Sequence, residues 1–158
     1  MLLVVNGSDR SRRPKKAFHS ISVSVFAHAT ENESKVLAAL RLIVPEHLSV
    51  DRLSVAGHFG NPMIILTARI EKTSETRHII GTIKKKLPKD ELMELREEIP
   101  QHLSQQCTLV MKFDKQAAAR GFLRQGKEDP IVLRAKIAAY PARVETATRI
   151  TRDLFDDT

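Results

Sequence analysis

Three separated stretches of this 158-residue chain place apolar side chains at every second position, and this alternation constrains the fold more than any other feature. A period of two indicates a strand with one buried face and one open face. The stretches begin near residues 18, 107 and 130. In the first, the inward positions are apolar and the outward ones mostly serine: Ile21, Val23, Val25 and Ala27 alternate with Ser20, Ser22, Ser24 and Phe26.

Two more strands are predicted over about 50–57 and 63–71. The segment Gly57-His58-Phe59-Gly60-Asn61-Pro62 joins them, and its two glycines, asparagine and proline predict a turn with unusual backbone angles. The five predicted strands therefore include one pair connected by a short turn.

Apolar residues at helical spacing predict helices between and after the strands. The first follows Thr30-Glu31-Asn32-Glu33, where Thr30 is expected to cap the helix and Glu33 to reach back, and it stops at Pro45. A second helix covers about 73–87. A third starts at Pro88, and the last starts at Pro141. The apolar stripe of the third helix is expected to run through Leu92, Leu95, Ile99 and Leu103.

The order is strand, helix, two strands, two helices, two strands, helix, which predicts an α+β fold. We expect a mainly antiparallel five-stranded sheet with helices packed on one face, and the first helical crossover leaves room for one parallel pair. Residues 17–158 would form this single domain, and residues 1–16 a basic N-terminal arm.

The charge of the chain favours a polyanionic partner. Its net charge is +7, and its sequence pI is about 9.8. The excess is concentrated in the arm and in residues 107–143, which hold eight basic and three acidic side chains. With six Phe, one Tyr and no Trp, the chain is poor in aromatic platforms for stacking bases, so binding through phosphates and shape is expected.

Other function classes find little support in the sequence. The single cysteine, Cys107, excludes a disulfide framework, and it is expected to be a buried, inert thiol. His28, His58, Asp114 and Asp129 are too scattered for a metal motif, so neither metal nor cofactor is expected. No membrane helix or signal peptide is predicted, and a cytoplasmic location is expected.

The outward positions of the predicted sheet are the first candidate RNA-binding surface. They carry Ser20, Ser22, Ser24, Thr108, Lys112, Arg134 and Lys136. Hydroxyl and cationic side chains on an open sheet face suit phosphates and 2′-hydroxyls, although an ordinary solvated face has the same pattern. The arm adds a second set of cations: Arg12, Arg13, Lys15 and Lys16.

Five short motifs, in this order and spacing, resemble an archaeal family of small RNA-binding proteins described as predicted exosome subunits. They are His28-Ala29-Thr30-Glu31, Lys35-Val36-Leu37-x-Ala39-Leu40, Gly57-His58-Phe59-Gly60-Asn61-Pro62, Asp114-Lys115-Gln116-x-Ala118 and Asp129-Pro130-Ile131. The likeness covers about residues 17–155. Lys112 stands where the family frequently has arginine. Lysine keeps the positive charge but lacks the guanidinium group that can bond a phosphate through two N–H groups.

The resemblance implies a fold like that of the large-subunit ribosomal protein that contacts 5S ribosomal RNA. It also implies a non-catalytic role in RNA processing, degradation or ribosome metabolism. It singles out His58, Asn61, Lys115 and Gln116 as RNA-contacting positions. The expected partners are a structured or ribosomal RNA and subunits of an RNA-processing complex. The alternatives are a protein-interaction subunit without RNA contact and, with less support, a hydrolase that uses the turn residues.

Overall fold

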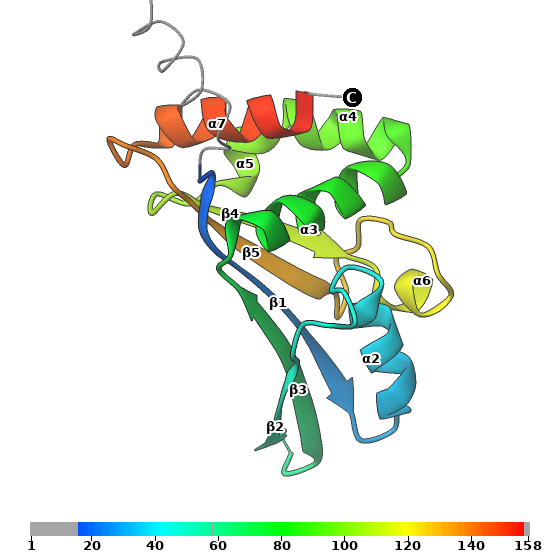
Figure 1. The fold of residues 1–158 in the computed structure, drawn as a ribbon. Coiled ribbons are helices and arrows are strands. Elements are labelled where there is room, and N and C mark those ends of the chain that lie inside the picture. The colour runs from blue at the N-terminus through cyan, green and yellow to red at the C-terminus, as the bar shows by residue number, and fades with distance from the viewer. Residues whose placement is uncertain (1–15, 58, 157–158) are drawn as a thin grey trace, which may run out of the picture.

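The computed structural model describes residues 16–57 and 59–156, and it contains one five-stranded sheet (Figure 1). In spatial order the strands are β2 (Asp51–Ala56), β3 (Pro62–Ile70), β1 (Phe18–His28), β5 (Ile131–Ile137) and β4 (Thr108–Phe113). Every neighbouring pair is antiparallel. The predicted α+β class is confirmed. The parallel pair does not form, because β3 lies between β1 and β2.

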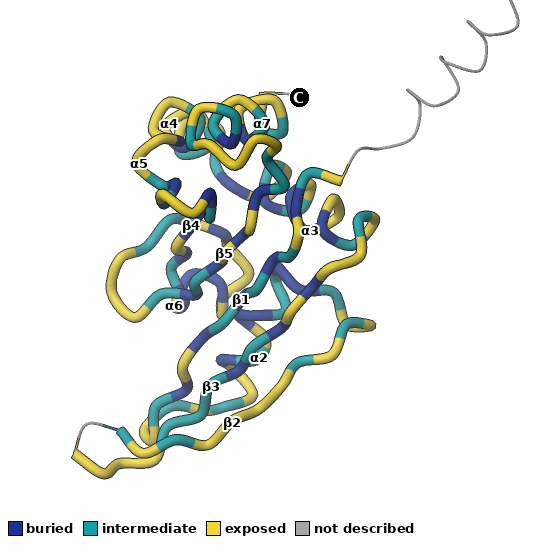
Figure 2. The backbone as a smooth tube through the Cα atoms, turned by 90° about the vertical axis from the view of Figure 1, so that its left-hand side faces the viewer, coloured by how far each residue is buried: buried dark blue, intermediate teal, exposed yellow. Residues whose placement is uncertain are grey.

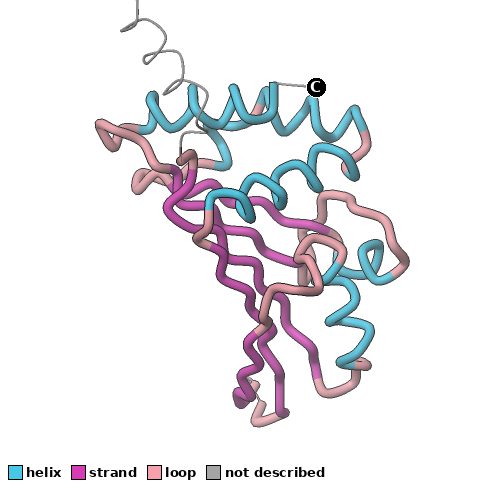
Figure 3. The backbone as a smooth tube through the Cα atoms, viewed as in Figure 1, coloured by secondary structure: helices cyan, strands magenta, loops and turns pink. Residues whose placement is uncertain are grey.

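The helices are α2 (Glu33–Arg41), α3 (Thr73–Lys86), α4 (Lys89–Glu97), α5 (Ile99–His102), α6 (Lys115–Ala119) and α7 (Val144–Asp156). Figure 3 shows α2, α3 and α6 over one side of the sheet, and α4 beside α7 at one end of the molecule. None of the described helices is long and apolar enough to cross a membrane.

The core lies between the helices and the inward face of the sheet. Ile21, Val23 and Val25 of β1 are almost fully buried, as their alternation predicts. The inward residues of β4 and β5 are buried as well, among them Leu109 and Leu133. Figure 2 shows the burial decreasing toward β2, most of which is exposed. The helices leave the opposite face of the central strands open.

The first helix is capped by a different residue from the one expected. Asn32, not Thr30, is the N-cap, and its side chain accepts hydrogen bonds from the backbone N–H groups of Ser34 and Lys35. Asn and Thr both suit this position, so the sequence allowed either. Glu33 does not reach back as in a capping box. Its carboxylate instead accepts two hydrogen bonds from Arg52 of β2, at 2.8 and 3.0 Å.

The predicted helix that begins at Pro88 is divided in two. α4 ends at Glu97 and α5 begins at Ile99, with Pro100 in its first turn. A proline inside a helix removes one N–H and clashes with the carbonyl four residues earlier, so one continuous helix is excluded. The break lets α5 pack along the edge of β4, where Leu103 bridges to Leu109.

Candidate nucleic-acid interface

The sheet register brings four cations together on the outward face. Ser22 of β1 lies between Arg69 of β3 and Arg134 of β5. One row along, Ser20 pairs with Lys136, which also pairs with Thr108 of β4. Lys112 of β4 is outward by the same alternation. We call Arg69, Lys112, Arg134 and Lys136, with the hydroxyls of Ser20, Ser22, Ser24 and Thr108, the basic sheet face.

The cations of this face are exposed and largely uncompensated. Within the described part of the chain, Lys112, Arg134 and Lys136 make no ion pair, and Arg69 has only a long one to Glu71, at 3.4 Å. Neighbouring strands lie about 5 Å apart, so side chains from β3 to β4 span roughly 15 Å. Arg69 was missed by sequence reasoning, although it follows the same alternation along β3.

A groove with a volume of about 720 Å³ borders this face along the edge of β4. Val110 and Lys112 form its floor, α5 forms one side, and residues 125–127 form the other. The imidazole Nδ1 of His102 lies 3.2 Å from the carbonyl oxygen of Val110 and fixes α5 to the strand edge. Lys127 adds a cation to the groove, and Glu98, whose Oε2 lies 3.9 Å from His102 Nε2, adds a carboxylate on the side of α5.

The loop between α6 and β5 is fixed against the end of β4. The Asp114 N–H donates to the Arg124 carbonyl at 2.8 Å, and the Gly126 N–H donates to the Lys112 carbonyl at 3.1 Å. Gly126 is required by close approach, since a Cβ there would lie 2.6 Å from Cα of Asp114. The groove therefore has a defined wall on this side.

Lys115 is not on the surface, contrary to its expected contact with RNA. Its side chain is only 3% exposed. The Nζ atom donates to the carbonyl of Phe26 at 3.0 Å, to Glu31 Oε1 at 2.8 Å and to Asp129 Oδ2. A buried ammonium must be paired and hydrogen-bonded, and these three acceptors meet that need. The contacts assign Lys115 to the support of the site.

Lys115 is the centre of a cluster drawn from three of the family motifs. His28 Nε2 lies 3.0 Å from Asp129 Oδ2, and the backbone N–H of His28 donates to Glu31. His28, Glu31 and Asp129 together present atoms spaced for a metal ion. The Lys115 ammonium already bonds to the two carboxylates and supplies the positive charge there. The sequence placed these residues at turns, but only the fold brings them together.

The electrostatics of the cluster are visible at Glu31. Burial raises the pKa of its carboxyl, but the hydrogen bond from Lys115, the backbone hydrogen bond from His28 and the charges of both residues outweigh burial. The pKa of Glu31 is therefore lowered below its usual value. The cluster holds this carboxylate ionised and ties the end of β1 to the starts of α6 and β5.

Of the other loop residues, Asn61 and Gln116 are exposed. The Asn61 carbonyl accepts from the Gly57 N–H at 2.6 Å and closes the turn before β3. Its neighbour Gly60 has a φ of +79°, which glycine adopts at little cost. Gln116 borders a small hollow beside Glu31 and Lys115. His58 lies outside the described residues.

The two loops share one edge of the sheet but do not meet. β2 and β4 run in the same direction, so both loops follow strand ends on the same side. Three strands separate β2 from β4, which puts them about 19 Å apart. The β1–α2 turn lies between, with His28 beside Asn61 and Glu31 beside Gln116. A single site built from both loops is therefore not formed.

Most of the basic arm lies beyond the described residues, including Arg12, Arg13 and Lys15. Lys16 is described and exposed, just before β1.

A family model for RNA binding matches residues 20–137, from β1 through β5. The chain belongs to this RNA-binding family. The RNA-binding protein PAB1135 of Pyrococcus abyssi is 30% identical over 144 residues, covering 87% of this chain and 94% of that protein. The resemblance drawn from the motifs is thus confirmed as far as an RNA-binding family with an archaeal member.

Two solved structures are similar to this one over nearly their whole length. The protein AF2318 of Archaeglobus fulgidus has a TM-score of 0.79 at 26% identity, covering 87% of this chain and 99% of that one. Mth689, a DUF54 protein of Methanothermobacter thermautotrophicus, has a TM-score of 0.75 at 28% identity, covering 88% and 98%. The α+β domain of this chain therefore has the fold of these archaeal proteins.

Proposed function

We propose that the protein binds structured RNA through the basic sheet face, as a non-catalytic accessory to RNA processing and degradation or to ribosome metabolism. The observation that carries the proposal is the register that sets Arg134 and Arg69 on either side of Ser22, with Lys136 and Lys112 close by. Membership of an RNA-binding family supports the same partner. In the cytoplasm, a structured or ribosomal RNA and the subunits of an exosome-type complex would be its partners.

The chemistry of the face suits an RNA backbone. Duplex RNA is recognised mainly by its shape and by contacts to phosphates and 2′-hydroxyls. Lysine and arginine neutralise phosphates, and the serine hydroxyls between them donate to or accept from ribose. The groove beside β4 adds Lys127 and the amides of Gln101 and Gln125 along the same path.

The buried lysine of the titratable cluster serves the fold and not a reaction. A catalytic acid or base must reach a substrate atom within hydrogen-bonding distance. In the cluster, Lys115 is buried and His28, Glu31 and Asp129 are bonded to it or to one another. These contacts account for the Lys115 ammonium as part of the fold, while the side chains of His28 and Asp129 are 42% and 39% exposed.

A second candidate is a protein-interaction subunit without RNA contact. It is favoured by a row of apolar side chains on the same sheet face, beyond Ser24 toward the end of β1. In this row Leu53, Ile65 and Phe26 pair across β2, β3 and β1. Leu53 is 58% exposed and Phe26 is 39% exposed. Exposed apolar patches commonly mark protein interfaces.

The test compares two triple variants of equal charge. Changing Lys112, Arg134 and Lys136 to alanine should weaken the binding of unrelated structured RNAs by similar factors. The slope of log affinity against log salt should fall by up to about 0.7–0.9 for each phosphate that the variant no longer neutralises. In the control, Lys72, Arg77 and Arg149, which are also exposed, are changed to alanine.

Filter binding or fluorescence anisotropy across a salt series measures both quantities. If both triple variants lost RNA affinity equally, net charge and not the basic sheet face would determine the affinity. Binding of a protein partner that ignores salt but fails in Leu53→Ser would support the second candidate.

A further inference from the structure

A second hollow, with a volume of about 540 Å³, lies on the helical side of the molecule. It is bounded by the end of α3, the start of α4 and the segment after α6, and its lining includes Lys86, Pro88, Arg120, Phe122 and Arg124. An aromatic ring and three cations around one hollow are the features expected for a nucleotide, which pairs an aromatic base with an anionic phosphate.

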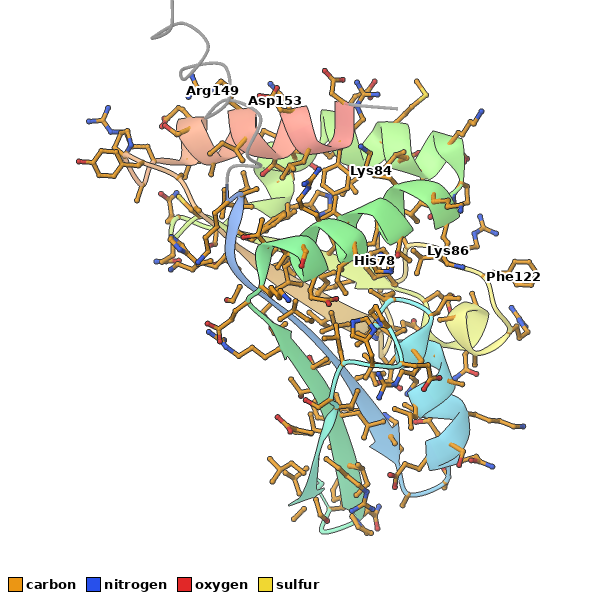
Figure 4. All side chains as sticks on the ribbon, in the orientation of Figure 1. His78, Lys84, Lys86, Phe122, Arg149 and Asp153 are labelled. Carbon is orange, nitrogen blue, oxygen red and sulfur yellow. The ribbon has the colours of Figure 1, made fainter. Side chains whose placement is uncertain are left out.

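Phe122 is displayed to solvent at this hollow and is 64% exposed. The two residues around it are fixed: Gly121 closes α6, and the following Leu123 is only 2% exposed. Figure 4 shows the ring projecting outward on the side of the molecule where Lys86 also lies. An exposed phenylalanine between two fixed residues suits contact with a partner better than packing.

The backbone holds Phe122 in a defined place. The Phe122 N–H donates to the Ala117 carbonyl and the Gly121 N–H donates to the Ala118 carbonyl. This pair of hydrogen bonds is the Schellman motif that ends many helices. Gly121 has the positive φ, +92°, that the motif requires. A side chain held in this way loses little backbone freedom when it binds.

Two cations at the hollow are available to an anion. Lys86 and Arg120 are exposed, and neither forms an ion pair within the described residues. Arg124 is already paired, with its Nε 3.1 Å from Glu91 Oε2. Lys86 and Arg120 are therefore the groups expected to contact phosphate.

The hollow is connected to the basic sheet face by one short loop. Residues 120–124 line the hollow, and residues 125–127 line the groove beside β4. This loop passes around the edge of the sheet, from the helical side to the open face. Phe122 and Lys127 are five positions apart along the chain, so their Cα atoms lie within about 18 Å of each other.

We propose that this hollow binds unpaired nucleotides of the same RNA that the sheet face holds as a duplex. A base stacks on Phe122, and Lys86 and Arg120 contact the adjoining phosphates. The protein then selects RNA with a single-stranded extension beside a helix. This inference rests on the proposed function, since the duplex part is bound by the basic sheet face.

The experiment uses two RNAs, a blunt-ended hairpin and the same hairpin with a single-stranded extension, in separate 5′ and 3′ versions. The wild-type protein should bind one extended RNA more tightly than the blunt one. Phe122→Ala should remove at least about fivefold of that gain, because stacking one base on an aromatic side chain is worth about 1–3 kcal/mol. Binding of the blunt hairpin should be unchanged.

Matched variants separate stacking from general effects. Phe122→Trp should keep the preference, since a larger ring also stacks. Tyr140→Ala removes another exposed aromatic side chain, one that is 96% exposed, and should have no effect. Changing Lys86 and Arg120 to alanine should lower the salt slope for the extended RNA only. A 2-aminopurine in the extension should lose fluorescence on binding to the wild type but not to Phe122→Ala.

Two results would overturn the inference while leaving the proposed function intact. One is equal affinity of the wild type for blunt and extended RNAs. The other is a preference that survives Phe122→Ala with unchanged 2-aminopurine quenching. Binding of neither RNA by the wild type would reject the proposed function itself. Thermal melting of every variant shows whether the fold is kept, as expected for substitutions of exposed side chains.

Discussion

Single residues on this chain divide into those proposed to contact RNA and those that hold the fold together. Lys112 and Lys115 are three positions apart, yet one is exposed and the other is buried. The difference follows from their places: Lys112 is an outward position of β4, while Lys115 begins α6 and points beneath the β1–α2 turn. Both are lysines near the same strand end, so charge alone could not separate an exposed residue from a buried, supporting one.

Replacing Lys115 by methionine should lower the free energy of unfolding by about 1–3 kcal/mol, because Glu31 and Asp129 would lose their shared donor. Lys112→Met, the control, should change it by less than about 0.5 kcal/mol. Urea titrations measure both. The RNA affinity of the folded protein should fall in Lys112→Met and not in Lys115→Met. A loss of RNA affinity in Lys115→Met but not in Lys112→Met would instead indicate that Lys115 contacts RNA.

Through Glu31, the stability that this cluster gives to the fold depends on pH. The pKa of its carboxyl is lowered in the folded state, so its ionisation stabilises the fold above its unfolded pKa, near 4.3. That stabilisation is lost as the pH falls through the folded pKa. Between pH 6 and pH 3, wild-type stability should therefore decrease more steeply than that of Glu31→Gln. If the two curves of stability against pH ran parallel, the Glu31 carboxylate would not contribute to the pH dependence of stability.

At the scale of elements, the loop after α6 connects the two surfaces proposed to contact RNA. The loop is fixed by close backbone approach at Gly126 and by the helix end at Gly121. Pro100 has a comparable role, since the break that it imposes lets α5 form the wall of the groove. Short, irregular segments thus shape the proposed RNA-binding surface, while the regular strands supply its cations.

Gly126→Ala should destabilise the protein by about 1–3 kcal/mol, because the new Cβ would meet the backbone of Asp114. It should also weaken RNA binding by displacing the loop. Gly81→Ala is the matched control. Gly81 lies within α3 with open space around it, so alanine there should stabilise by about 0.5–1 kcal/mol. Calorimetry measures whether each variant is more or less stable than the wild type. Unchanged stability in Gly126→Ala would mean that the loop is not fixed.

For the molecule as a whole, the distribution of charge matters more than its total. Acidic residues predominate in α4, while the cations of the basic sheet face lie on β3, β4 and β5. The basic arm at 1–16 adds five more cations at one end of the chain. Electrostatic attraction of this kind raises association rates and falls with salt.

Deleting residues 1–16 should leave the melting temperature nearly unchanged, because the segment offers little apolar surface to a core. It should reduce RNA affinity and lower the salt slope if the arm tethers phosphates. Calorimetry and anisotropy on the truncated protein measure the two effects. A large loss of stability would instead indicate that Leu2–Val5 pack against the domain.

The five strands, most of the helices and the inward face were predictable from the sequence, because alternation and helical spacing are local patterns that burial enforces. Ile21, Val23 and Val25 are predicted and observed in the core for this reason. The outward cations Lys112, Arg134 and Lys136 follow from the same periodicity. Family membership was also visible, in short motifs whose roles the sequence did not explain.

Which of those residues meet depends on how the whole chain folds. Insertion of β3 between β1 and β2, and of three strands between β2 and β4, depends on pairing between segments far apart in sequence. That pairing brought His28, Glu31, Lys115 and Asp129 into one cluster, and it placed Arg69 beside Ser22. Local patterns hold no information about such long-range pairing. Burial of the Lys115 ammonium therefore could not be predicted from charge and spacing.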